Sequence, residues 1–170
     1  MAKKRIQIVI IIVFVSLCGH LFFTYLSKNY MIGLDNQEHR CLPGKVFLIR
    51  IDDQAEFKKG DIIAFYTDEK QSEYFKPGTK MLKMIVGVPG DNISIDEKFI
   101  YINGEIKGKI LEIDSKGKKI RTKTIINNRP IPKDCYAVMG TNPKSFDSRY
   151  WGLICKENKG NIIGKGFKLF

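Results

Sequence analysis

Two residues in this sequence pair a reactive atom with a setting that could activate it. Lys83 lies within the apolar run of residues 81–86, which reads as a β-strand. Burial there would disfavour the charged form of the side chain, and a lysine held neutral accepts a proton as a general base. Cys41 precedes a Pro-Gly turn and carries a thiol, which ionises far more readily than a hydroxyl. A base and a nucleophile of these types can together attack a carbonyl carbon.

Both residues also have a plain structural interpretation. Lys83 could point outward from an edge strand, with its ammonium group in water. Cys41 could pack as a small hydrophobic side chain. Taken singly, neither position decides between a catalytic and a structural role.

The segments that would position these residues read as short strands. β-Branched and aromatic residues concentrate in the runs 45–50, 61–66, 80–88, 92–95, 99–102, 136–139 and 161–164. Turn signals such as Pro89-Gly90-Asp91 and Asn103-Gly104 separate them. No long helical periodicity appears after residue 27, and residues 27–40 read as a linker. The sequence therefore predicts a mainly β, antiparallel domain within residues 28–170.

The N-terminal segment reads as a membrane anchor. Lys3, Lys4 and Arg5 precede residues 6–26, which are almost wholly aliphatic or aromatic. A helix over those residues spans roughly 31 Å, close to the ~30 Å hydrocarbon core of a bilayer. The rival interpretation is a cleaved signal peptide, but the run is long for one and no small-residue cleavage site follows it. By the positive-inside rule we expect residues 1–27 to form a cytoplasmic tip and a single inner-membrane span, with residues 28–170 outside.

The charge of the chain is concentrated in one segment. The 170 residues carry a formal net charge of +11, and basic residues far outnumber acidic ones in residues 107–129. Alternating polar and apolar residues there predict a hairpin, whose charge either solvates a strand face or attracts anionic lipid headgroups. An extracytoplasmic location disfavours a nucleic-acid partner. The 2 His and 4 Cys show no clustered ligand spacing, so neither a metal nor a cofactor is expected.

Two of the cysteines flank residues 140–152. If the strands that enter and leave this segment are antiparallel neighbours, Cys135 and Cys155 lie within bonding reach in an oxidising compartment. Cys18 would lie in the membrane, and Cys41 must stay reduced to act as a nucleophile. A Cys135–Cys155 disulfide is therefore the pairing compatible with activity.

Three motifs, taken in order, resemble those of the type I signal peptidases, which are membrane proteases with a Ser/Lys dyad. Cys41-Leu42-Pro43 matches the nucleophile box that follows the membrane helix. Residues 83–91 match the general-base box, with Met84 where arginine is usual. Residues 140–152 match the last box, with Thr141 where aspartate is usual. The chain looks closest to the conjugative-transfer (TraF-type) branch of that family.

The resemblance implies a signal-peptidase-like β domain that cleaves signal sequences from exported precursors. Cys41, where the family usually carries serine, would attack the carbonyl carbon, and Lys83 would accept and return the proton. Ser145 matches the serine that hydrogen-bonds the lysine and orients it. The implied partners are precursors that bear signal peptides, a conjugative pilin among them, and membrane lipids.

The same resemblance assigns supporting roles around the dyad. Asp147 and Arg149 match a pair that holds the loop of the last box. The oxyanion would be met by the Cys41 backbone N–H and a second donor near residue 39, for which His39 is the candidate.

The cysteine leaves alternatives open. An active Cys/Lys dyad is favoured because the base is intact and the thiol is itself a nucleophile. The substitution could equally mark a membrane-anchored module that binds without cutting. A pilin cyclase would use the same residues to join chain ends. A thiol oxidoreductase is disfavoured, since no Cys-x-x-Cys is present.

Overall fold

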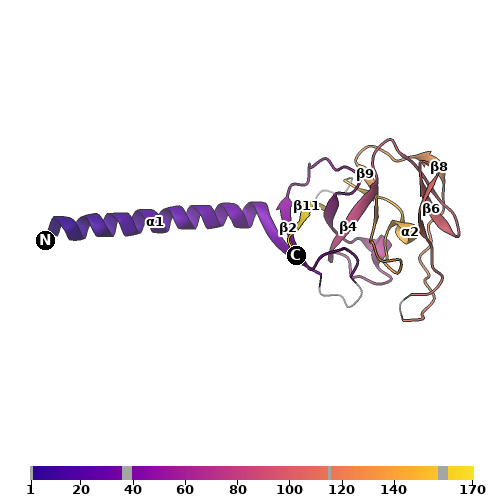
Figure 1. The fold of residues 1–170 in the computed structure, drawn as a ribbon, viewed down its shortest axis with the longest axis horizontal. Helices are drawn as coiled ribbons and strands as arrows, with labels where there is room; N and C mark the ends of the chain where they lie inside the picture. Colours follow the sequence, from indigo (N-terminus) through magenta and orange to yellow (C-terminus); the bar gives the residue numbers. More distant parts are fainter. Residues whose placement is uncertain (1, 36–39, 115, 157–160) are drawn as a thin grey trace.

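A long helix projects from a β domain in the computed structural model, which describes residues 2–35, 40–114, 116–156 and 161–170. Helix α1 (Ala2–Asn29) contains the apolar run and extends it at both ends (Figure 1). None of its residues is buried, and it is long and apolar enough to cross a membrane. An aliphatic and aromatic surface of this kind is suited to burial in the hydrocarbon core of a membrane.

The larger sheet carries the residues singled out above. Within the described residues it has seven strands in the order β1-β2-β11-β3-β4-β9-β10, and neighbouring strands are antiparallel. The strands are β1 (Tyr30–Leu34), β2 (Val46–Ile51), β3 (Ile62–Tyr66), β4 (Lys80–Gly87), β9 (Cys135–Met139), β10 (Ile154–Cys155) and β11 (Ile162–Lys168).

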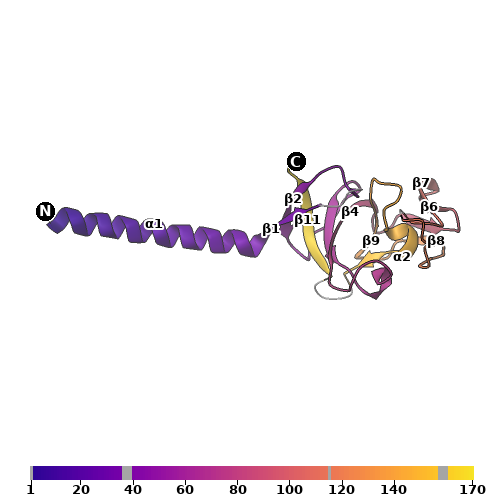
Figure 2. The same cartoon turned by 90° about the horizontal axis from the view of Figure 1, so that it is seen from below.

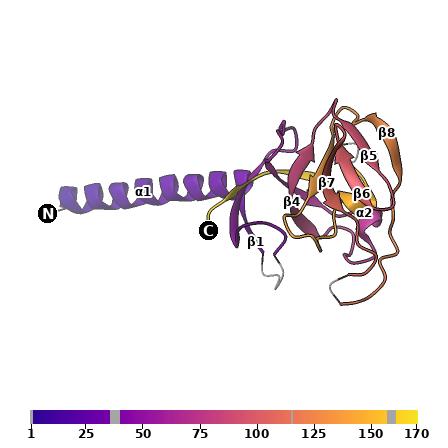
Figure 3. The same cartoon turned by 45° about the vertical axis from the view of Figure 1, so that its right-hand side comes forward.

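A smaller sheet lies at the end of the domain far from α1 (Figures 1 and 3). In the described part of the chain it has four antiparallel strands in the order β7-β6-β5-β8. They are β5 (Asn92–Ile95), β6 (Phe99–Ile102), β7 (Glu105–Lys109) and β8 (Ile126–Pro130). Asn103 and Gly104 both have positive φ and make the tight β6–β7 turn that the Asn-Gly pair predicts.

Two short helices interrupt the strands. The 3-10 helix η1 (Glu69–Gln71) follows β3, and its N-cap Asp68 accepts a hydrogen bond from the Lys70 backbone N–H. Helix α2 (Ser148–Trp151) follows β9, and its N-cap is Asp147. Both caps use a carboxylate to satisfy N–H groups that the first helical turn leaves without partners.

The main hydrophobic core fills the space between the two sheets. It includes Ile63, Phe65 and Ile85 from the larger sheet and Ile93 and Ile100 from the smaller one, all at most 1% exposed. Strand β4 alternates along its length, which places residues 81, 83, 85 and 87 on its buried face. The period-2 pattern that builds the core therefore also carries Lys83 into it.

The predicted fold class is confirmed, and the expected strand runs correspond to β2, β3, β4, β5, β6, β9 and β11. Two expectations need correction. Tyr30–Leu34, expected to be linker, is strand β1 and pairs with β2 directly after α1. The predicted hairpin of residues 107–129 shrinks to one isolated bridge among the described residues, between Ile113 and Lys119, because residues 105–109 pair with β6 and residues 126–130 pair with β5 instead.

Candidate active site

Lys83 lies in the interior of the larger sheet. Its strand β4 sits between β3 and β9, so the edge-strand interpretation is wrong. The residue is 1% exposed, and its Nζ donates a hydrogen bond of 2.6 Å to Ser145 Oγ. This contact joins two residues that the motif resemblance had placed together.

The loop that carries Ser145 packs tightly against the segment around Cys41. A β-carbon on Gly140 would overlap the Ser145 side chain and would lie 2.9 Å from the Cys41 carbonyl oxygen. Only glycine leaves room for this approach. The Ser145 backbone N–H donates to the Asn142 carbonyl at 2.9 Å, which closes the loop above β9.

Asp147 and Arg149 form a buried ion pair behind the loop. Arg149 Nε and Nη2 each donate to Asp147 at 2.8 Å, and the two side chains are 2% and 0% exposed. Burial by itself lowers the pKa of Arg149, but the hydrogen bonds and charge of Asp147 outweigh it and raise that pKa above its ordinary value. The guanidinium therefore stays charged within the protein.

This pair holds the loop from both ends. Asp147 Oδ2 accepts the Gly140 N–H at 2.9 Å. Arg149 Nη1 donates to the Pro143 carbonyl at 2.7 Å, and Nη2 donates to the Ser145 carbonyl at 2.9 Å. The bidentate geometry leaves the loop few alternative conformations. The structure thus brings these two residues to the position that a loop-holding role requires.

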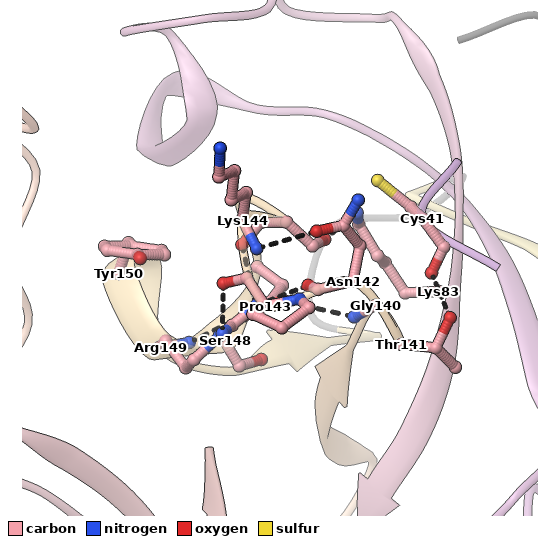
Figure 4. A network of polar contacts seen from close by, with 12 residues as sticks. Cys41, Lys83, Gly140, Thr141, Asn142, Pro143, Lys144, Ser148, Arg149 and Tyr150 are labelled. Atoms are coloured by element: carbon pink, nitrogen blue, oxygen red, sulfur yellow. Dashed lines mark hydrogen bonds and ion pairs between the residues drawn. The ribbon is translucent and has the colours of Figure 1, made fainter. Parts of the chain in front are cut away.

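The backbone of Cys41 is hydrogen-bonded to the loop that carries Ser145. Its carbonyl oxygen accepts the Thr141 N–H at 2.7 Å and the Thr141 hydroxyl at 3.2 Å. Figure 4 shows the thiol directed away from these bonds, toward Lys83 and Asn142. The Cys41 N–H donates to Asp35 Oδ2 at 3.2 Å, a partner that sequence reasoning missed because Asp35 fell in the expected linker. His39, the expected second oxyanion donor, lies outside the described residues.

Two cavities meet at this point, and Cys41, Lys83 and Phe75 line both. One has a volume of about 310 Å³, and we call it the apolar cavity because residues such as Ile32, Leu42, Phe47, Met81 and Leu82 line it. The other has a volume of about 600 Å³, and we call it the basic cavity. Its walls include Tyr74, Asp114, Lys116, Lys118, Lys144 and Phe146. A polypeptide that crosses the Cys41 thiol therefore has room on both flanks.

The cysteines have distinct surroundings. Cys135 and Cys155 are opposite each other in the β9–β10 ladder and form a disulfide, so the predicted pairing is confirmed. The cysteines outside it are Cys18, in α1, and Cys41. Among the described residues, no group of three or more His, Cys, Asp and Glu side chains is arranged to hold a metal ion.

Comparisons with known proteins agree on one family. The family model described as "signal peptidase, peptidase S26" matches residues 4–170. Signal peptidase I P of Bacillus subtilis subsp. natto is 28% identical over 171 residues, which cover 95% of this chain and 83% of the relative. Signal peptidase IB of Staphylococcus aureus is 31% identical over 121 residues, 64% of this chain and 58% of the relative.

Among solved structures, a signal peptidase I from Enterococcus faecalis V583 aligns with a TM-score of 0.37 and 22% identity, covering 65% of this chain and 97% of that one. The family model, in contrast, extends over nearly the whole sequence and includes Cys41, Lys83 and the loop of Ser145. The chain therefore belongs to the signal peptidase family, peptidase S26.

Proposed function

We propose that this protein is a membrane-anchored endopeptidase that removes signal sequences from exported precursors, with Cys41 as nucleophile and Lys83 as general base. The observation that carries the proposal is the buried Lys83 Nζ, 2.6 Å from Ser145 Oγ, in a chain of the signal peptidase family. A lysine in the core needs a reason to be there, because hydrophobic side chains of similar volume cost less to bury. Proton transfer next to a thiol is such a reason.

The proposed reaction proceeds through a thioester. Cys41 Sγ attacks the scissile carbonyl carbon as its proton passes to Lys83 Nζ. The C–N bond then breaks, and Lys83 returns the proton to the leaving amine. Lys83 next takes a proton from water, whose oxygen attacks the thioester. The acyl product leaves as a carboxylic acid, and the proton returns to the Cys41 thiolate.

Ser145 serves in this scheme as a positioning residue. Its hydroxyl accepts the Lys83 hydrogen bond and so fixes the direction of the amine. The Cys41 backbone N–H is proposed to stabilise the oxyanion, which requires it to leave its 3.2 Å bond to Asp35 as the substrate binds. His39 is retained as the proposed second donor.

The apolar cavity supports specificity for small, uncharged side chains before the scissile bond. It has a volume of about 310 Å³, and apolar residues of β1 and β4 line it together with Cys41 and Lys83. A charged side chain that packs against these apolar walls would lose its hydration at a cost in free energy, although Asp35 and Lys80 also line the cavity. Signal sequences that end in a small-x-small pattern fit this requirement.

We further propose that the N-terminus is cytoplasmic and the β domain lies outside. Lys3, Lys4 and Arg5 favour that orientation, and the disulfide is typical of an oxidising compartment. The chain end lies near the junction of α1 and β1 (Figures 2 and 3), where Phe167, Leu169 and Phe170 are exposed and suited to contact lipid. A reporter that works only after export, fused after Phe170, tests the orientation. Activity of a cytoplasm-specific reporter at the same point would overturn it.

The test of activity is cleavage of precursors by the purified full chain in lipid nanodiscs, read by the masses of the products. Precursors of secreted proteins and of conjugative pilins are both tested, because the motifs resemble the conjugative-transfer branch. Hydrolysis yields a mature chain with a new N-terminus. A cyclised product would instead weigh one water less than the same linear chain. Cys41→Ala is the control, and equal processing by that variant would overturn the proposed mechanism.

A further inference from the structure

We propose that the basic cavity binds an acidic segment of the substrate, formed by the residues that directly follow the scissile bond. This inference rests on the proposed function, because it assigns a substrate segment to the second of the two cavities that share Cys41 and Lys83. It concerns which precursors are cut well rather than how the bond is cut.

The direction of the substrate follows from where the cavities lie. The apolar cavity is lined by residues 31–35, in and just after β1, the strand that continues directly from α1. It therefore lies on the side of the domain next to α1, which in the proposed topology is the side where the apolar part of a signal sequence resides. The walls of the basic cavity come from residues 116–120 and 142–150, on the side of the domain that faces away from α1 (Figure 1). A chain that leaves the membrane and crosses Cys41 thus passes next into the basic cavity.

The charge of this cavity is strongly one-sided. Lys116, Lys118 and Lys144 line it, against a single carboxylate among the described lining residues, Asp114. That carboxylate already accepts the Lys116 and Lys118 backbone N–H groups at 2.8 Å and 2.9 Å and the Tyr74 hydroxyl at 3.1 Å. Asp114 therefore holds the backbone of its own turn and offsets part of the charge, that of Lys118 above all, but three ammonium groups against one carboxylate leave the described lining net positive.

The lysines of the basic cavity differ from others in the domain. Lys59 and Lys165 form ion pairs with Asp91 and Asp61 at 2.8 Å and 2.7 Å. In the described part of the chain, none of Lys116, Lys118 and Lys144 is in such an ion pair. All three are exposed. They therefore remain available to carboxylates of a ligand at little desolvation cost.

The wall that carries two of these lysines is tied to the body of the domain. Glu73 accepts the Arg121 and Thr122 backbone N–H groups at 2.8 Å and 2.6 Å. The Tyr150 hydroxyl accepts the Leu111 N–H at 3.1 Å at the other end of the segment. Because Leu111, Arg121 and Thr122 are bonded to the body of the domain, Lys116 and Lys118 line the cavity before any substrate arrives, which lowers the ordering cost of binding.

Binding is tested with Cys41→Ala in nanodiscs of zwitterionic lipid, since this variant holds a peptide without cleaving it. Fluorescent peptides share a signal-sequence end and differ in the three residues after the scissile bond, which are acidic, neutral or basic. We expect the acidic peptide to bind about 3- to 10-fold more tightly than the neutral one, since each exposed ion pair contributes at most about 1 kcal/mol. Raising the salt concentration should shrink the difference.

The lysines are then changed in the same background. Lys118→Gln with Lys144→Gln should bring the acidic-to-neutral affinity ratio close to one. Lys144→Glu should favour the basic peptide. Lys98→Gln with Lys133→Gln, which removes equal charge from exposed positions outside both cavities, serves as the matched control and should keep the ratio of the parent. Equal affinity for all three peptides, or equal loss in the control, would overturn the proposal.

Cleavage by the parent protein separates this inference from the function on which it rests. If precursors are cut but acidic, neutral and basic peptides have the same kcat/KM, the cavity assignment fails and the peptidase stands. If none is cut, the peptidase proposal fails, while the binding ratio still reports on the cavity. A lysine effect seen only in nanodiscs of anionic lipid, and not with peptides, would mean that the cavity contacts headgroups and would also overturn the proposal.

Discussion

Lys83 Nζ and Ser145 Oγ are 2.6 Å apart although 62 residues separate them in the chain. The contact exists because β4 and β9 are neighbours in the larger sheet and the loop after β9 folds back over β4. A buried amine therefore has a fixed hydroxyl partner beside the Cys41 thiol. Substitution of each of these three residues should affect cleavage in a different way.

The first prediction concerns the nucleophile. Cys41→Ala should abolish precursor processing, whereas Cys41→Ser should retain a reduced rate, because an oxygen nucleophile is smaller and harder to deprotonate. A small thiol reagent should inactivate the parent protein and spare Cys41→Ser. Cys18 is present in both proteins and so controls for other thiols. Full processing by Cys41→Ala would show that Cys41 is not the nucleophile and has a structural role only.

The second prediction concerns the base. Lys83→Met keeps the length and apolar contacts of the side chain but removes the proton acceptor, so cleavage should fall by about 10²- to 10⁴-fold. Lys83→Arg should fail as well, because a guanidinium stays protonated. Initial rates are compared after circular dichroism has shown that both variants fold. Wild-type rates in either one would show that Lys83 does not activate Cys41.

Ser145→Ala tests the positioning role. Loss of a hydrogen bond to an ionisable partner costs about 1.5–3 kcal/mol, so kcat should drop by about 10- to 100-fold with little change in KM. Ser145→Thr, which restores a hydroxyl, should recover part of the rate. Ser94→Ala, in the smaller sheet, is the control. A rise in KM at constant kcat would instead place Ser145 in substrate binding.

The disulfide should stabilise the β domain. It closes a loop with a sequence separation of 20, for which chain entropy predicts about 3 kcal/mol in the free energy of unfolding. Changing Cys135 and Cys155 to serine should lower the urea midpoint of the protein in detergent accordingly. Cys18→Ser should leave the midpoint unchanged. An unchanged midpoint in the double variant would mean that the β9–β10 pairing holds without the covalent bond.

Acid should loosen the wall of the basic cavity. Partial burial raises the pKa of Glu73, but hydrogen bonds from Thr122 and Arg121 outweigh it, so that pKa lies below its ordinary value. Because the pKa of Glu73 is lower in the folded state, its hydrogen bonds to residues 121 and 122 stabilise the fold fully at pH values above the unfolded-state pKa, about 4.5. This stabilisation is lost as the pH falls through the folded-state pKa.

Hydrogen exchange of the Arg121 and Thr122 amides measures this effect. Both should be protected at pH 7 and lose protection on acidification, beyond the intrinsic pH dependence of exchange. Glu73→Ala should lack protection already at pH 7, while Glu97→Ala should resemble the parent. Protection that persists in Glu73→Ala would mean that contacts other than the Glu73 carboxylate hold residues 121 and 122 in place.

Most of the larger sheet was predictable because its strands are dense in β-branched and aromatic residues. The pattern alone left open whether Lys83 points into the core or into water, and the position of β4 between β3 and β9 decides this. Strand β1 was missed because it is short and contains Gly33. That glycine is needed for packing rather than for a turn, since a β-carbon there would lie 2.9 Å from Leu82 Cδ1. Such a requirement arises only once β1 lies against β2 and approaches β4.

The expected hairpin failed for a related reason. Alternation in residues 119–125 predicts a strand, but the Arg121 and Thr122 N–H groups find the Glu73 carboxylate, 48 and 49 residues away, instead of a neighbouring strand. Period-2 patterning reports which side chains are buried and not which backbone groups pair. The Asp35 contact to Cys41 is of the same kind, because a side-chain bond across a loop leaves no periodic signal.

Helix α1 ends at Asn29 and β1 begins at Tyr30, so no linker separates them. This direct connection limits how far the β domain can move from the end of the helix. In the proposed topology, the direct connection between the span and the sheet keeps the β domain, and Cys41 with it, close to the bilayer. For the proposed peptidase, a precursor would then need to present its cleavable bond close to the bilayer as well as offer a suitable sequence. A flexible spacer inserted between Asn29 and Tyr30 would broaden the choice of bonds along the precursor without altering any residue of the catalytic centre.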